Sequence, residues 1–243
     1  MNTFTEDNFN NGFVVFKVNG RPPSVHSKSS LKHYFKDAVH EVTSRSDYII
    51  TGTCHIAIEY RCNHITRRKN PGIYDMDNII KPILDSLVGL NGLLVDDVLV
   101  NRVTVNWQDT QEKEHFEVEI EYPDLLFARK DDLIFLKSQS GWCFPTSRKL
   151  ASEPKLLELM SLHFSRWDSI SSEDDYYNNL SGLPLQSFIY HAKIQSKDYE
   201  IIDMPYNNKK KANNLLHTEP AKNAGPVSST LAIERWRNYD ESI

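Results

Sequence analysis

Cysteine is scarce in this chain. The sequence also lacks a CxxC pair, a long apolar run and a signal peptide, which are features that would assign a protein directly to a class. Three widely spaced cysteines without a CxxC pair favour a reducing, cytoplasmic location over a disulfide framework or a cysteine-based zinc site. No run of eighteen apolar residues occurs, and the first residues lack the basic and apolar regions of a signal peptide, so no membrane partner is expected. The formal net charge of −5 does not indicate a nucleic-acid-binding protein, which leaves that question to local clusters of charge.

What the sequence does contain is a concentration of carboxylates in the otherwise apolar stretch from Tyr74 to Val100. Besides Lys81, the charged residues of this stretch are Asp75, Asp77, Asp85, Asp96 and Asp97. The spacing of Asp77, Lys81 and Asp85 predicts that they share one helical face. Singly, these aspartates would be helix caps and turn residues. Carboxylates gathered at two chain reversals repel one another unless cations compensate, which predicts a site for a hard divalent cation.

The helix expected after Asp77 also has a core-facing stripe, formed by Ile80, Ile83, Leu84 and Leu87. This stripe lies on a different face from the charged residues. Pro82 lacks an N–H group and fits only the first turn of a helix, so regular helix is expected to begin near residues 78–81. Asp75 and Asp77 would then lie in the turn before the helix, on backbone that allows them to converge on a metal ion.

Hydrophobic periodicity predicts the order β-α-β-α-β-β for residues 12–122, an α+β domain with helices on a small mixed sheet. The expected elements are a strand at 13–18, a helix at 29–46, a strand at 48–62, the helix after Asp77, and strands at 98–107 and 115–122. The last two strands are joined by a short polar turn and are expected to form an antiparallel hairpin. Residues 1–11 are a polar leader.

Residues 123–243 form an accessory region whose periodicity is weaker and whose role the sequence leaves open. We expect a mixed structure, with helices at 125–136 and 156–167, short strands at 185–191 and 199–204, a flexible stretch at 209–230 and an amphipathic segment at 231–239. No chemical motif stands out in this half.

The segment from Arg61 to Gly72 is basic and rich in turn-forming residues, which predicts a loop. Its candidates for contacts to DNA are Arg61, Arg67, Arg68 and Lys69. Most charge runs are solvated surface. This one stands directly before the aspartates, where it could clamp a phosphate backbone against a bound metal ion.

Three classes of enzyme combine such carboxylates with a metal ion. HAD-type phosphatases place a D-x-D-x-T/V loop after an apolar strand, whereas Ile79 stands in the Thr/Val position here and Gly72-Ile73-Tyr74 precedes the motif. Glycosyltransferases with a DxD motif need a longer nucleotide-binding domain upstream. Metal-dependent nucleases need carboxylates, a nearby lysine and a basic approach path, and this sequence has all three.

The spacing of these residues resembles the RusA family of Holliday junction resolvases. The pattern D-x-D-N-x-x-K-x-x-x-D-x-L stands here from Asp75 to Leu87, and Gly92 and the pair Asp96-Asp97 follow it before an apolar residue. The segment from Asn19 to Ser24, NGRPPS, is similar to the family's proline-containing turn after its first strand. The similarity covers about residues 12–122, and the short family members have no counterpart of the remainder.

The resemblance implies roles for individual residues. The aspartates that match the family's metal ligands are Asp75, Asp77 and Asp97, with Asp96 as the partner of the last. Lys81 matches the lysine at the scissile phosphate. Asn78 would orient Asp75 or Asp97, whereas Asp85 is expected to be structural, through an ion pair with Lys81.

The resemblance also implies an activity and a partner. A homodimer would hydrolyse phosphodiester bonds in branched DNA, four-way junctions above all, with Mg²⁺ or alternatively Mn²⁺, and would leave 5′-phosphates. The long accessory region keeps a second interpretation open, in which the chain is a DNA- or partner-binding module of a larger complex, such as a host-defence or mobile-element nuclease. In that case the accessory region would bind a protein partner.

Overall fold

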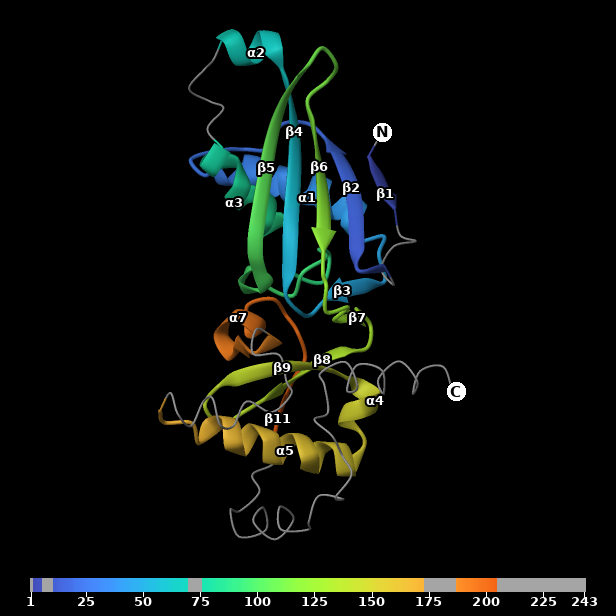
Figure 1. Cartoon of the computed structure of the whole chain (residues 1–243), viewed down its shortest axis with the longest axis vertical. Coiled ribbons are helices and arrows are strands. Elements are labelled where there is room, and N and C mark those ends of the chain that lie inside the picture. Colours follow the sequence, from blue (N-terminus) through green and yellow to red (C-terminus); the bar gives the residue numbers. More distant parts are fainter. Residues whose placement is uncertain (1, 6–10, 70–75, 173–186, 205–243) are drawn as a thin grey trace.

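A computed structural model describes residues 2–5, 11–69, 76–172 and 187–204 of the chain. The first half folds around a five-stranded sheet of order β1-β2-β6-β4-β5, with the helices behind the sheet in Figure 1. Its strands are β1 (Thr3–Thr5), β2 (Phe13–Asn19), β4 (Cys54–Asn63), β5 (Val100–Thr110) and β6 (His115–Glu121), and its long helices are α1 (Ser29–Thr43) and α3 (Met76–Ser86). The coarse expectation of an α+β fold is therefore confirmed.

The order of these elements follows the predicted alternation. The last two strands run antiparallel, as predicted, but they do not pair with each other as a hairpin. Strand β4 lies between β5 and β6, parallel to β5 and antiparallel to β6. The four residues between β5 and β6 cross over the end of β4, and β6 continues on to pair with β2. The polar leader also contributes more than expected, because β1 pairs antiparallel with β2 at the other edge of the sheet.

The single strand expected at 48–62 is two strands, β3 (Tyr48–Ile50) and β4. The break has a packing reason: β3 leaves the main sheet and pairs with β7 (Phe127–Arg129), in a separate two-stranded sheet. Gly52 lies in the break, where a Cβ atom would come within 2.6 Å of the Leu126 side chain. The predicted alternation is confirmed along β4, whose Cys54, Ile56, Ile58 and Tyr60 are buried.

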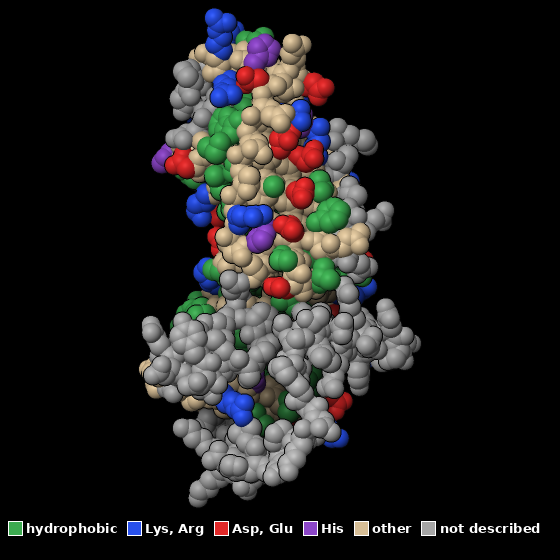
Figure 2. Space-filling model, in the orientation of Figure 1, with side chains coloured by type: hydrophobic (Ala, Val, Ile, Leu, Met, Phe, Trp, Pro, Cys, Tyr) green, Lys and Arg blue, Asp and Glu red, His purple; other side chains and the backbone are tan. Residues whose placement is uncertain are grey.

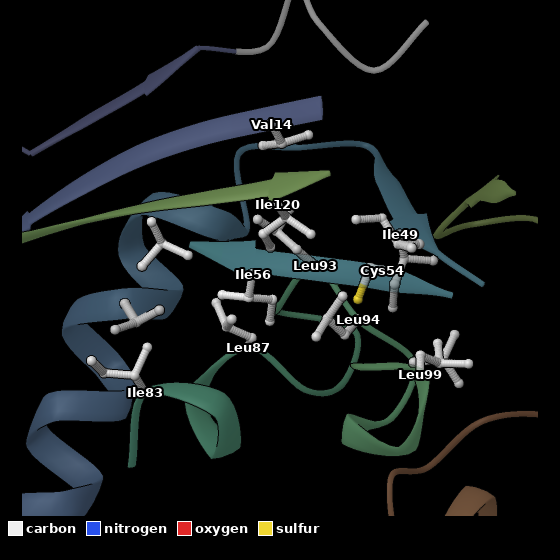
Figure 3. Packing of buried hydrophobic residues seen from close by; sticks show 14 of the residues in the cluster. Val14, Ile49, Cys54, Ile56, Ile83, Leu87, Leu93, Leu94, Leu99 and Ile120 are labelled. Carbon is white, nitrogen blue, oxygen red and sulfur yellow. The ribbon is translucent and has the colours of Figure 1, made fainter. Parts of the chain in front are cut away.

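The core of the first half lies between the sheet and the two helices. Figure 3 shows Ile83 of α3 and Leu87, which directly follows this helix, directed at the same layer of side chains as Ile56 of β4. Burying aliphatic side chains of this size contributes about 1.5–3 kcal/mol each. The stripe expected on α3 is partly correct: Ile83 and Leu87 are fully buried, whereas Ile80 and Leu84 are half-buried.

Helix α3 begins earlier than expected and contains Pro82 in its interior, not in its first turn. An interior proline leaves the carbonyl four residues earlier without its usual N–H donor. That carbonyl belongs to Asn78, and it accepts a hydrogen bond of 3.0 Å from the backbone N–H of Val25. The helix therefore tolerates Pro82 because the segment that follows β2 supplies the missing donor.

The second half contains a four-stranded sheet of order β10-β9-β8-β11. Its strands are β8 (Leu133–Lys137), β9 (Trp142–Ser147), β10 (Ile189–Tyr190) and β11 (Ile201–Asp203), and its helices are α4 (Arg148–Ala151), α5 (Pro154–Asp168) and α7 (His191–Gln195). The helix expected at 156–167 and strands within 185–191 and 199–204 are confirmed, while the helix expected at 125–136 is wrong. The segments at 209–230 and 231–239 lie outside the described residues.

The two halves meet across β8, which is covered on both faces. Ile134 and Leu136 pack with Phe164 of α5 in one hydrophobic cluster, and Leu133 and Phe135 belong to the cluster of the first half. A strand buried on both faces reads as a continuous apolar run, and such a run cannot be told from a buried helix by periodicity. This explains the wrong helix at 125–136.

In Figure 1, α7 lies between the sheet of the second half and the lower end of β5. Among the described helices, none is long and apolar enough to cross a membrane.

Candidate functional site

Helix α3 separates the predicted metal ligands into two groups. It connects β4 to the parallel strand β5, so its two ends lie at opposite ends of these strands. Asp77 lies in its first turn, close to the residues that follow the carboxyl end of β2, as the bond between Val25 and Asn78 shows. Asp96 and Asp97 directly precede β5 at the other end. An eleven-residue helix is about 16 Å long, so within one chain Asp77 and Asp97 cannot share a metal ion. Asp75 lies outside the described residues.

The basic segment is not the loop that the sequence predicted. Strand β4 continues through Arg61 to Asn63, and residues His64–Lys69 form the short helix α2. The side chain of Asn63 explains the helix, because its Oδ1 accepts hydrogen bonds from the backbone N–H groups of Ile65 and Thr66, both at 3.1 Å. Residues 70–72 lie outside the described ranges. Helix α2 lies beyond the upper end of the sheet in Figure 1, and α3 begins below it.

The four candidate DNA contacts differ in how they are held. Arg61 pairs with Glu59, and Arg67 pairs with Asp109 at 3.0 Å while its guanidinium lies 5.3 Å from the centre of the Trp107 ring. Arg68 and Lys69 end α2 as exposed side chains without an ion-pair partner among the described residues. These two cations are therefore the best placed of the four to contact a phosphate backbone.

The predicted pairing of Lys81 with Asp85 is confirmed. Their Nζ and Oδ1 atoms are 3.1 Å apart, one turn along the exposed face of α3. An exposed pair of this kind contributes about 0.3–0.5 kcal/mol. Asn78 is half-buried in the first turn of α3, where its backbone carbonyl bonds to Val25. Asn78 and Lys81 lie in the first turns of α3 with Asp77, whereas Asp85 lies in its last turn.

Asp96 is buried, and its carboxylate is occupied by groups of the protein itself. Its Oδ1 accepts from the Lys193 ammonium at 3.0 Å and from the Val98 backbone N–H at 3.1 Å, and its Oδ2 accepts from the Lys197 ammonium at 2.6 Å. Burial disfavours the charged carboxylate, but the hydrogen bonds from Lys197, Val98 and Lys193 outweigh it and hold the pKa of Asp96 below its ordinary value. Asp96 is thus an ionised, paired carboxylate that caps the short 3₁₀ helix Asp97–Leu99.

Asp97 is the exposed member of the pair. Its side chain is 41% exposed, and its Oδ1 lies 3.6 Å from the Lys193 Nζ, which bridges the two aspartates. Tyr199 lies under the same cluster, where burial and then the negative charge of Asp96 raise the pKa of its phenol. Asp97 therefore retains solvent access that Asp96 lacks.

A divalent cation does not fit these residues as one chain arranges them. Within the described ranges, no three His, Cys, Asp or Glu side chains come together in a group that could hold a metal ion. Both oxygens of Asp96 are taken by ammonium groups, and Asp77 lies a helix length away. Asp77 and Asp97 keep the exposure that a metal ligand needs, so each could contribute to a site completed by other groups.

The open face of the five-stranded sheet carries a column of acidic side chains. Figure 2 shows acidic side chains along it. Its central strand β6 presents Glu117, Glu119 and Glu121, and the last of these contacts His55 of β4 at 3.2 Å and Arg102 of β5 at 3.9 Å. A column of carboxylates repels phosphate.

Three residues of the site were not predicted from the sequence: Lys193, Lys197 and Tyr199. The two lysines are four residues apart, which is a signal of a shared helical face but not of a partner. Their partner Asp96 lies 97 and 101 positions earlier in the chain, and no local pattern links such distant residues.

No protein-family model matches the chain, and a search of the curated proteins finds no match either.

Proposed function

We propose that the protein is a metal-dependent, structure-selective DNA endonuclease of the RusA type, which acts on four-way or other branched DNA and leaves 5′-phosphates. The single observation that carries the proposal is the placement of the acidic pattern on α3, the crossover helix between two parallel strands in a β-α-β-α-β-β domain. Its carboxylates stand at both ends of that helix, and the basic helix α2 precedes it in the chain. Free, buried Cys54, Cys62 and Cys143 are consistent with a reducing, cytoplasmic location.

The separation of the two acidic groups makes a homodimer part of this proposal. Asp77 and Asp97 of one chain are too far apart to bind one ion, so a second copy would bring its Asp97 to the Asp77 end of the first. A dimer related by a two-fold axis would contain two such composite sites, one for each of two opposed strands of a junction. Bound Mg²⁺ would polarise the phosphoryl oxygens and activate water. Arg68 and Lys69 would hold the DNA backbone beside it.

The test is cleavage of labelled four-way, forked and linear DNA with and without Mg²⁺. We expect Mg²⁺-dependent cleavage of branched DNA by the wild type and none by Asp77→Asn, which should still bind the junction. Asp85→Asn is the matched control, because it removes a carboxylate from the same helix without removing a proposed ligand, and it should cut as the wild type does. Equal cleavage by the wild type and Asp77→Asn would contradict the assigned site.

A second candidate function is favoured by the ion pairs of Asp96. An aspartate whose two oxygens are held by the accessory region is consistent with a binding module in a larger complex, whose nuclease chemistry is secondary or silent. The same experiment separates the two: junction binding without cleavage in Mg²⁺ or Mn²⁺ supports the binding module.

A further inference from the structure

The cluster formed by Asp96, Lys193 and Lys197 joins two regions that lie far apart in the sequence. Asp96 belongs to the acidic stretch before β5, whereas Lys193 lies on α7 and Lys197 lies just after it. The carboxylate is 2% exposed, and the Lys197 side chain is 19% exposed, so water screens this pair far less than it screens the surface pair of Lys81 and Asp85. The connection is therefore both charged and largely removed from solvent.

A buried carboxylate needs a counter-charge and donors for its lone pairs, and here the protein supplies both. Three donors, two of them cationic, contact the two oxygens of Asp96. Lys197 is itself tied to the same turn, because its Nζ also donates to the backbone carbonyl of Lys193 at 3.2 Å. A metal ion at Asp96 would have to displace an ammonium group and remain beside the other one, which like-charge repulsion opposes.

We propose that Lys193 and Lys197 are the permanent counter-cations of Asp96, so that this aspartate anchors the accessory region to the carboxylate site and is not a metal ligand. The inference departs from the role that the resemblance assigns to Asp96. It also gives the second half of the chain a task at the site: Lys193 bridges to Asp97 and fixes the position of that carboxylate. The ion pairs stand whether or not the proposed nuclease function is correct.

The first arm of the test is a double-mutant cycle on urea unfolding of the full chain. Asp96→Asn and Lys197→Met should each lower the folding equilibrium constant at least about thirtyfold, because each leaves a buried group without its partner. In the double variant, the decrease in the folding equilibrium constant should be at least about tenfold smaller than the product of the decreases in the two single variants. A matched cycle on the exposed pair, Lys81→Gln with Asp85→Asn, should show coupling within about twofold. If Lys197→Met does not fold, Lys193→Gln replaces it, since that side chain is 46% exposed. Lys193→Arg, which keeps the cation, should restore most of the stability that Lys193→Gln loses.

The second arm measures binding of Mn²⁺ alone, by its electron paramagnetic resonance signal. The double variant of Asp96→Asn with Lys197→Met keeps the local net charge, so it should bind Mn²⁺ within about threefold of the wild type, whereas Asp97→Asn should lose at least tenfold. Loss of Mn²⁺ binding in the charge-balanced double variant would make Asp96 a ligand and overturn the inference, as would a coupling energy of zero in the first arm. If the wild type binds no Mn²⁺, the proposed metal-dependent function fails, and the unfolding cycle still decides whether the lysines pair with Asp96.

Discussion

The backbone N–H of Val25 takes the place of the N–H that Pro82 lacks. It donates to the carbonyl oxygen of Asn78 at 3.0 Å, and so it fastens the chain that follows β2 to the first turn of α3. Two stretches of the chain some fifty residues apart therefore meet in the folded structure. The bond also fixes the end of α3 that carries Asp77.

Pro82→Ala tests this relationship. An interior proline usually costs about 3 kcal/mol relative to alanine. Here the carbonyl is already satisfied and the Pro82 ring is buried, so we expect the replacement to change the free energy of unfolding by less than about 1 kcal/mol. Urea denaturation followed by circular dichroism measures the change. A gain above about 2 kcal/mol would show that Val25 does not compensate the missing donor.

Mixing two inactive variants tests the composite site. Asp77→Asn and Asp97→Asn should each be inactive as homodimers. If each site combines Asp77 of one copy with Asp97 of the other, a heterodimer of the two variants contains one intact site, and mixed samples should nick branched DNA in one strand. The measurement is strand-specific cleavage after refolding the variants together. Absence of activity in the mixture, with heterodimers present, would place both aspartates in one chain's own site.

Removing the cations at the end of α2 tests the approach of DNA. We expect Arg68→Gln with Lys69→Gln to weaken junction binding and to reduce the slope of log affinity against log salt by up to about 1.8, or roughly 0.9 for each lost phosphate contact. Binding is measured by fluorescence anisotropy in EDTA, so that cleavage does not interfere. Lys155→Gln on α5 is the matched control and should leave the slope unchanged. An equal loss in the control would argue against a specific path over α2.

Acidification tests the burial of His40. Burial, and then the positive charge of Lys36, lower its pKa, although the Ser86 carbonyl and Asp37 act in the opposite direction and Lys130 adds to the lowering. A histidine with a lowered pKa in the folded state is protonated more readily in the unfolded state. Its contribution to stability is therefore present above the unfolded pKa of about 6.5 and is lost as the pH falls through the lower folded value. The free energy of unfolding should decrease from pH 7 to pH 5, and less steeply in His40→Gln. Parallel curves would contradict this role of His40.

Much of the first half could be predicted from sequence because its signals are local. The alternation along β4 and the helical period from Ser29 to Thr43 each reflect one covered face, and the ion pair of Lys81 with Asp85 follows from their spacing. The failures have a common origin in tertiary structure. Pairing with β7 splits the strand at Gly52, and β4 intervenes between two strands that a short turn connects.

The sequence likewise predicts one part of the candidate site and fails to predict another. Residue types and spacing identify the aspartates, but the distance between Asp77 and Asp97 depends on the direction of α3 between two parallel strands, which spacing does not encode. The role of Asp96 depends on Lys193 and Lys197, whose side chains reach it only after the second half has folded against the first.

The central position of β6 in the first sheet also bears on how the chain is made. This strand is the last of the five to leave the ribosome, yet β2 and β4 both pair with it and not with each other. Until residue 121 has been synthesised, β2 and β4 expose backbone edges that other chains could pair with. Nascent chains that stall before β6 should therefore be the species most prone to aggregate.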